Sequence, residues 1–239
     1  MQNYMQTLNK LQKTNKIYFN VSKKYFYKLV KYNPQSDEDF ELCGKLTIKN
    51  IKFSALQRLL PLDEIDINDQ TQINNYFLKD GNFEKLRPAF QYMTGKNNEV
   101  EKIGYQKIID GSNDDAFVGH AGFIILEAKN GIATKIERGI HIDPDYRDSK
   151  SGVSKKQGRI VMNLCLDNLQ ENTDNVDLDG ELLSSILKTN IRSQQFTLKN
   201  KLNIGEPTGQ DELTYKWNQR IGDFIKRIPE IKKNFNIEK

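Results

Sequence analysis

The segment over residues 147–153 has the residue types of an anion-binding loop. It contains Arg147, Lys150 and Gly152 and leads into a predicted helix. A loop that feeds a helix N-terminus presents free backbone N–H groups and the positive end of the helix dipole. The first turns of this helix carry three basic residues, where the dipole ordinarily favours acidic ones: Lys155, Lys156 and Arg159. This arrangement predicts a site for a phosphate-bearing ligand; the alternative is a solvated basic face.

Two cysteines and two histidines are the side chains that could ligate a metal or act as nucleophiles and bases. Cys43 and Cys165 lie far apart, and neither they nor His120 and His141 have the spacing of metal ligands. We expect two reduced, buried thiols and no metal site. Each histidine is a candidate base, but an ordinary structural role is favoured, on a strand face for His141 and at the edge of the core for His120.

Composition indicates a globular protein with one well-buried domain. The chain has 239 residues, of which 37 % are hydrophobic and 28 % charged. The net charge of +4 permits attraction to phosphates but does not by itself indicate a nucleic-acid binder. No run of about 18 apolar residues predicts a membrane span. The polar start of the chain lacks the apolar segment of a secretory signal, so we expect a cytoplasmic location.

The elements that would position the loop alternate between strands and helices. Strands are predicted over 103–109, 117–128 and 133–143, and turn signals at 110–113 and 129–131 make them an antiparallel meander. The later elements are a helix over about 153–170, a strand over 182–188, a helix over 193–201, a strand over 212–217 and a helix over 220–234, interrupted or kinked at Pro229. The order predicts a mixed α/β layered domain.

The first part of the chain is expected to differ from the rest. Residues 1–40, rich in Tyr, Phe and Lys, are predicted to form a helical extension to a domain over 41–239. The spacing of apolar residues over 46–53 predicts a strand with a register irregularity. Ser54 is a plausible cap for a helix that follows, and helices and loops are expected over 61–94.

Three segments, in this order, resemble elements of the GNAT acetyltransferases, most closely the ribosomal-protein N-terminal acetyltransferase branch. Residues 136–147, Ile-Glu-Arg-Gly-Ile-His-Ile-Asp-Pro-Asp-Tyr-Arg, are similar to the fourth strand of that family and its exit into the cofactor loop. Residues 118–122, Val-Gly-His-Ala-Gly, resemble a Gly-His element of the preceding strand, and residues 190–194, Asn-Ile-Arg-Ser-Gln, resemble a later Asn-x-x-Ser-Gln element. The resemblance spans about residues 100–217 and implies a mostly antiparallel mixed sheet flanked by helices.

The resemblance implies transfer of an acetyl group from acetyl-coenzyme A to a primary amine, on a protein N-terminus or a small molecule. Glu137 stands at the acidic position of the family's strand and would be the general base. By strand alternation its side chain should share a face with Gly139 and His141. The alternative is a surface glutamate or one ion-paired with a neighbour such as Lys135 or Arg138.

The resemblance also implies which residues hold coenzyme A. The main chain of Ile140 and Ile142 would pair with the pantetheine arm. The other implied contacts are Arg147, Lys150, Ser151, Gly152 and Val153 in the loop, then Asn190 and Ser193. Asn190 and Ser193 could alternatively form a plain helix cap.

Two departures from the family pattern support a second hypothesis. Lys150 stands where the first glycine of the loop is usual, and Thr197 stands where many of these enzymes place a tyrosine general acid. A degenerate domain that binds coenzyme A or a protein partner without catalysis is therefore the alternative. The extension over 1–40 could be an interaction arm, a dimer contact or a lid. Nucleic-acid binding through the Lys-aromatic stretch over 23–31 is a third, less favoured reading.

Overall fold

The structure, a computed structural model, describes residues 27–79, 81–94, 103–111, 113–147 and 154–235. Its centre is a seven-stranded sheet in the order β1-β2-β3-β4-β5-β7-β6. The strands are β1 (Tyr27–Lys31), β2 (Gln106–Asp110), β3 (Ala116–Lys129), β4 (Ile132–Ile142), β5 (Val176–Leu187), β6 (Gly209–Gln210) and β7 (Thr214–Arg220). The α-helices are α2 (Asp37–Asn50), α3 (Gln70–Leu78), α4 (Arg87–Thr94), α5 (Pro144–Arg147), α6 (Ser154–Glu171), α7 (Ile191–Lys199) and α8 (Ile221–Phe235). Short 3₁₀ turns are η1 (Ile51–Phe53), η2 (Ala55–Leu59), η3 (Phe83–Leu86) and η4 (Thr173–Asn175).

The predicted meander is confirmed. β2, β3 and β4 pair antiparallel in sequence, and Asn130 and Gly131 both adopt positive φ in the tight turn between β3 and β4. β5 then lies parallel to β4, and β7 returns antiparallel to β5. The result is the expected mixed α/β domain, with a mostly antiparallel sheet flanked by helices.

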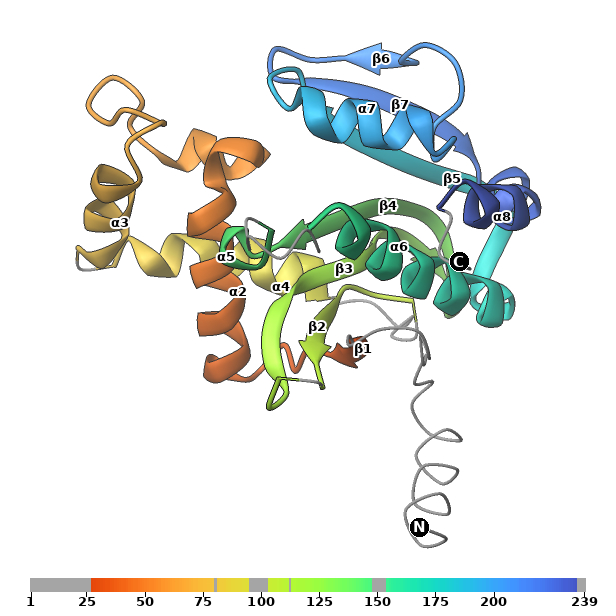
Figure 1. Cartoon of the computed structure of the whole chain (residues 1–239), viewed down its shortest axis with the longest axis horizontal. Coiled ribbons are helices and arrows are strands. Elements are labelled where there is room, and N and C mark those ends of the chain that lie inside the picture. Colours follow the sequence, from red (N-terminus) through yellow and green to blue (C-terminus); the bar gives the residue numbers. More distant parts are fainter. Residues whose placement is uncertain (1–26, 80, 95–102, 112, 148–153, 236–239) are drawn as a thin grey trace, which may run out of the picture.

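Two hydrophobic cores lie against the sheet. The larger core packs α6 and α8 against strand residues such as Phe123 and Ile136, both fully buried. The smaller core is built by α2, α3 and α4 around Phe40, Ile73 and Phe90. Figure 1 shows α3 at the end of the molecule away from β6, β7 and α7, with α2 between α3 and the sheet and α4 beside β3. The sheet is therefore covered by two groups of helices, each of which packs in its own core.

The strand predicted over 46–53 is wrong, because this segment is the end of α2 followed by η1. The helix begins at a cap in which the Ser36 hydroxyl accepts from the Asp39 N–H at 3.2 Å, and three acidic residues follow in its first turn. Cys43, Leu46 and Asn50 repeat at helical spacing and are buried. The apolar residues that fit a strand pattern also fit one face of this helix.

The helical prediction for residues 1–40 is wrong at Tyr27–Lys31, which forms edge strand β1 against β2. Tyr27 packs in the larger core, where its hydroxyl accepts a hydrogen bond from Gln157. Residues 1–26 lie outside the described residues. The Ser54 cap is confirmed, since its hydroxyl accepts from the Leu56 N–H, although the element that follows is a 3₁₀ turn. β5 begins earlier than predicted, at Val176, and α8 runs through Pro229 without interruption.

Candidate active site

The parallel strands β4 and β5 separate halfway along their length. Their last three register pairs are Lys135–Glu181, Ile136–Leu182 and Glu137–Leu183. Beyond this point β4 stays paired only to β3, as far as Ile142, and β5 only to β7, as far as Leu187. The separation of the two strands can be followed in Figure 1. Each strand therefore turns an unpaired main-chain edge toward the other, and an edge of this kind can accept an extended ligand.

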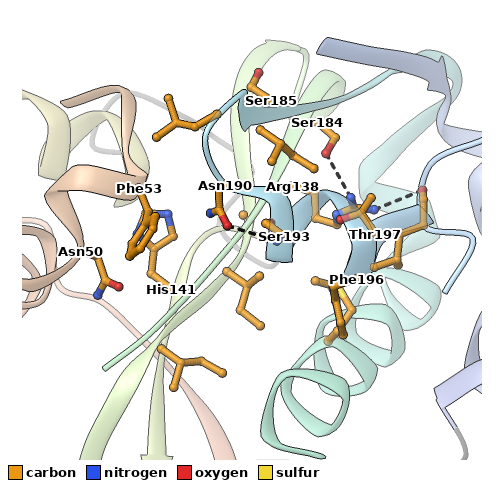
Figure 2. A pocket seen from close by; sticks show the side chains of 17 residues that line it. Asn50, Phe53, Arg138, His141, Ser184, Ser185, Asn190, Ser193, Phe196 and Thr197 are labelled. Atoms are coloured by element: carbon orange, nitrogen blue, oxygen red, sulfur yellow. Dashed lines mark hydrogen bonds between the residues drawn. The ribbon is translucent and has the colours of Figure 1, made fainter. Parts of the chain in front are cut away.

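A cavity of about 130 Å³ lies between the diverging strands. Its wall is formed by residues 138–142 of β4, residues 184–187 of β5, the first turns of α7 and Met162 of α6. Asn50 and Phe53 contribute from the opposite side, where α2 ends. Figure 2 shows Asn50, Phe53 and His141 on one side of Asn190, and Arg138 on the other. Side chains that belong to both faces of the sheet thus meet in one cavity.

Glu137 occupies the last paired position before the strands separate. Its side chain is half-buried and lies toward the N-terminal helices, where its charge contributes to raising the pKa of Tyr92 and of Tyr105, after the larger effect of burial. Neither of the neighbouring cations, Lys135 and Arg138, forms an ion pair with the Glu137 carboxylate. Lys135 pairs with Glu127 and Glu181, and Arg138 contacts neutral acceptors. Within the described residues, no ion pair or side-chain hydrogen bond engages the Glu137 carboxylate.

Gly139 permits a close approach between β4 and Tyr105. A Cβ atom at position 139 would lie 3.0 Å from two ring carbons of Tyr105 and would collide with its hydroxyl oxygen. Tyr105 is 4 % exposed, so its ring has little room to move away. The glycine that the sequence places between Glu137 and His141 thus lets a buried tyrosine lie directly over the strand.

The two histidines are cross-strand neighbours with different surroundings. His120 pairs in register with His141, and their ring centroids are 5.1 Å apart. His120 is fully buried, with Nδ1 3.2 Å from the Tyr32 hydroxyl and 3.7 Å from the Cys43 sulfur. Burial, and to a smaller extent the charge of His141, lower its pKa well below the usual value, so it is neutral at pH 7. His141 lines the cavity.

Asn190 and Ser193 form a helix cap at the wall of the cavity. The Asn190 side-chain oxygen accepts from the Ser193 N–H at 3.1 Å and caps α7. Both residues also line the cavity, as does Thr197, which is 4 % exposed. The helix therefore begins at the cavity wall, and its cap residues face the space that a ligand would fill.

The cofactor-loop residues are only partly within the described residues. β4 ends at Ile142, and α5 includes the backbone of Arg147. Nothing is described for the Arg147 side chain or for Lys150, Ser151, Gly152 and Val153. The structure thus places Ile140, Ile142, Asn190 and Ser193 around one cavity, with Glu137 at the point where the strands separate, and the roles of all the predicted site residues stay predictions.

Sequence reasoning missed Arg138 as a site residue. It is 8 % exposed, lines the cavity and donates to the Ser184 hydroxyl at 3.0 Å and to the Asn203 side-chain oxygen at 3.1 Å. The signal was present, because Ile136, Ile140 and Ile142 alternate on one strand face and an arginine interrupts this apolar series. A charge at a core-facing strand position indicates a special environment.

A second cavity of about 500 Å³ adjoins the first and shares Phe53 and Asn190 with it. Its other lining residues include the cations Lys49, Lys52 and Arg192. The Lys49 ammonium is engaged at 2.8 Å by Asp143 and at 2.7 Å by Asp145. Across the described ranges, no three His, Cys, Asp or Glu side chains are grouped to hold a metal ion, and no helix is long and apolar enough to cross a membrane.

A scan against protein-family models finds no match, and a search of curated proteins finds none either. Among solved structures, the chain is similar to mutant forms of the spermidine/spermine N-acetyltransferase SpeG from Vibrio cholerae, at 13 % identity and a TM-score of 0.47, over 84 % of this chain and 97 % of that one. It is also similar to a putative GnaT-family acetyltransferase from Bordetella pertussis, at 13 % identity and a TM-score of 0.43, over 86 % of this chain and 99 % of that one. A ribosomal-protein-S5-alanine acetyltransferase from Vibrio fischeri matches at 11 % identity and a TM-score of 0.43, over 87 % and 98 %. These structures are acetyltransferases, and at such values none of their residue roles or substrates is carried over to this chain.

Proposed function

We propose that this chain is a GNAT-type N-acetyltransferase, which transfers the acetyl group of acetyl-coenzyme A to a primary amine. The observation that carries the proposal is the separation of β4 from β5 after Glu137, with a cavity between the two unpaired edges. Such a cleft offers main-chain groups for an extended donor and is lined from both faces of the sheet, so donor and acceptor can meet inside it.

The pantetheine arm of the donor would lie along β4 in place of the missing strand. Its amides would pair with main-chain groups of Ile140 and Ile142, and Asn190 and Ser193 would contact it from the start of α7. Its pyrophosphate would lie at residues 147–153, where the chain enters α6. The loop follows the C-terminal end of β4, so the thioester end of the arm would point back toward Arg138 and Glu137.

The reaction needs a neutral amine and a positioned base. The amine nitrogen attacks the thioester carbonyl carbon, and the C–S bond breaks as the amide bond forms. The sulfur leaves with the bonding electron pair and takes up a proton to give the free thiol, while the amine loses one proton to a base. Main-chain N–H groups at the strand edge would stabilise the oxyanion that forms during attack.

Glu137 is the proposed base. A carboxylate that is half-buried and unengaged by any described cation is free to accept a proton, directly or through water. It lies where the strands begin to separate, on the face covered by the N-terminal helices. The amine would therefore approach from the side opposite to the main body of the donor.

The charge around the second cavity bears on the acceptor. Its lining carries Lys52 and Arg192, beside Lys49, whose charge Asp143 and Asp145 already engage. If the acceptor enters by this route, a polycation would meet like charge there, and an amine next to neutral or acidic groups would be favoured. We therefore propose a peptide N-terminus or small amine of low positive charge over a polyamine.

The first experiment is a calorimetric titration of the full chain with acetyl-coenzyme A, coenzyme A and ATP. We expect micromolar binding of both coenzyme A species and at least tenfold weaker binding of ATP. No binding of either coenzyme A species at millimolar concentration would refute the proposal. A screen of amine acceptors with a thiol-release assay then tests turnover.

One observation favours the second candidate, a domain that binds coenzyme A without catalysis. Thr197, at the position where a tyrosine acid is expected by resemblance, is buried against the cavity and is a poor proton donor. Tight coenzyme A binding with no thiol release for any amine, between pH 6 and 10, would support this candidate.

A further inference from the structure

Arg138 is a buried cation whose charge no described carboxylate balances. Its guanidinium donates to three neutral oxygens, the Ser184 hydroxyl, the Asn203 side-chain oxygen and the Leu202 carbonyl at 3.2 Å. These bonds use three of the five N–H groups of an arginine. Burial, and the nearby charge of Arg227, lower its pKa to about 10, which leaves it protonated at pH 7. The cavity wall thus carries a full positive charge.

A charge in such a place is costly unless an anion compensates for it. Removing a guanidinium from water carries a large desolvation penalty, and hydrogen bonds to neutral groups offset this penalty only in part. Arg227, half-buried nearby, adds to the positive potential rather than balancing it. An anionic group of a ligand entering the cavity would be the missing partner.

The position of Arg138 along the strand indicates which part of the ligand would be anionic. Arg138 lies four residues before Ile142, about 13 Å along an extended strand. In the donor orientation proposed above, the pyrophosphate lies beyond Ile142, and the arm runs back toward Arg138. The group that reaches Arg138 is therefore the acyl group, at the far end of the donor from its phosphates.

Resting on the proposed function, we propose that the donor site accepts acyl groups that end in a free carboxylate, and binds them more tightly than acetyl. The donors concerned are the half-thioesters of short dicarboxylic acids with coenzyme A. The guanidinium of Arg138 pairs with the distal carboxylate, which takes no part in the reaction. The thioester end reacts with the amine as for acetyl, and the product is an N-acyl amide that carries one additional negative charge.

The competing explanation is that Arg138 only braces the fold by joining β4 to Ser184 of β5 and to Asn203. A brace alone would make no difference between acyl groups, so selectivity between donors separates the two explanations. The matched control is Arg227, which is also an arginine bonded to neutral oxygens, those of Lys201 and Gln219, but does not line the cavity.

The test is calorimetric titration of coenzyme A, acetyl-coenzyme A and succinyl-coenzyme A into wild type, Arg138→Met, Arg138→Lys and Arg227→Met. In wild type we expect succinyl-coenzyme A to bind at least tenfold more tightly than acetyl-coenzyme A. In Arg138→Met the ratio should fall to within twofold of one, with coenzyme A affinity changed less than threefold. Arg138→Lys, which keeps the charge, should retain at least a threefold preference, and Arg227→Met should retain the wild-type ratio.

The outcomes distinguish the two proposals. If coenzyme A itself does not bind, the proposed function fails, and this inference fails with it. If coenzyme A binds but wild type shows no preference for the succinyl donor, only the inference is overturned, and this comparison requires no variant to fold. A preference that persists in Arg138→Met would equally overturn the role given to Arg138.

Discussion

Substitution of Gly139 by alanine tests the close approach between β4 and Tyr105. The added methyl would lie 3.0 Å from two ring carbons of Tyr105 and would collide with its hydroxyl oxygen. Since Gly139 does not have positive φ, the backbone accepts alanine, and the effect is steric. Overpacking of a buried site costs about 1–3 kcal/mol. For a chain of this size the melting temperature should fall by about 2–12 °C, at roughly 2–4 °C per kcal/mol.

The assay is thermal and urea unfolding of Gly139→Ala, Tyr105→Phe and the double variant. Tyr105→Phe removes the nearest atom, so the cost of the alanine should be at least halved in that background. Gly209→Ala is the control, because nothing lies within 4 Å of its added methyl, and its stability should be unchanged or raised by up to about 1 kcal/mol. If Gly139→Ala lowers the free energy of unfolding equally in wild type and in Tyr105→Phe, the close approach is refuted.

Three further predictions concern titratable groups. Glu137→Gln should lower turnover by about 10²–10⁴-fold with coenzyme A affinity unchanged, and a wild-type rate at every pH would remove Glu137 as the base. Because the pKa of His120 is lowered in the folded state, stability should be lost as pH falls below about 6.5, and His120→Gln should flatten that slope in thermal unfolding. Burial raises the pKa of Cys43 and Cys165 to about 12, so neither should react with a thiol reagent at pH 8 until the chain unfolds; fast native labelling of either would contradict this.

The sequence was most informative where local signals determine structure. The Asn130-Gly131 turn and the alternating apolar residues beside it predict the β3–β4 hairpin, because a tight turn leaves little choice of register. The segment over 46–53 was misread because its apolar residues fit both a strand and one face of a helix. The cap at Ser36 and the acidic residues after it decide for the helix, and they lie ten residues earlier in the chain.

The candidate site could be predicted only in part, since its geometry depends on contacts between distant segments. Glu137 and Asn190 were identified by their place in short motifs. Glu137 lies where β4 and β5 separate, and Asn190 follows the far end of β5 and lines the cavity. Phe53 and Asn50 could not be identified from the sequence, because they reach the cavity through the packing of α2 against the sheet. Arg138 was visible as an odd residue in an apolar series, but its acceptors are 46, 64 and 65 residues away in the chain.

The short β4–β5 ladder has a mechanical consequence. Strands β1 to β4 form one continuous part of the sheet, and β5, β7 and β6 form the other. The short β4–β5 ladder, which ends at Glu137 and Leu183, joins the two parts. The ion pair between Lys135 and Glu181, at 3.1 Å, lies within this ladder. Just beyond the ladder, Arg138 donates a hydrogen bond to Ser184 and so links β4 to β5. These contacts, together with the larger core in which α6 and α8 pack against both halves of the sheet, hold the two diverging strands at a fixed separation.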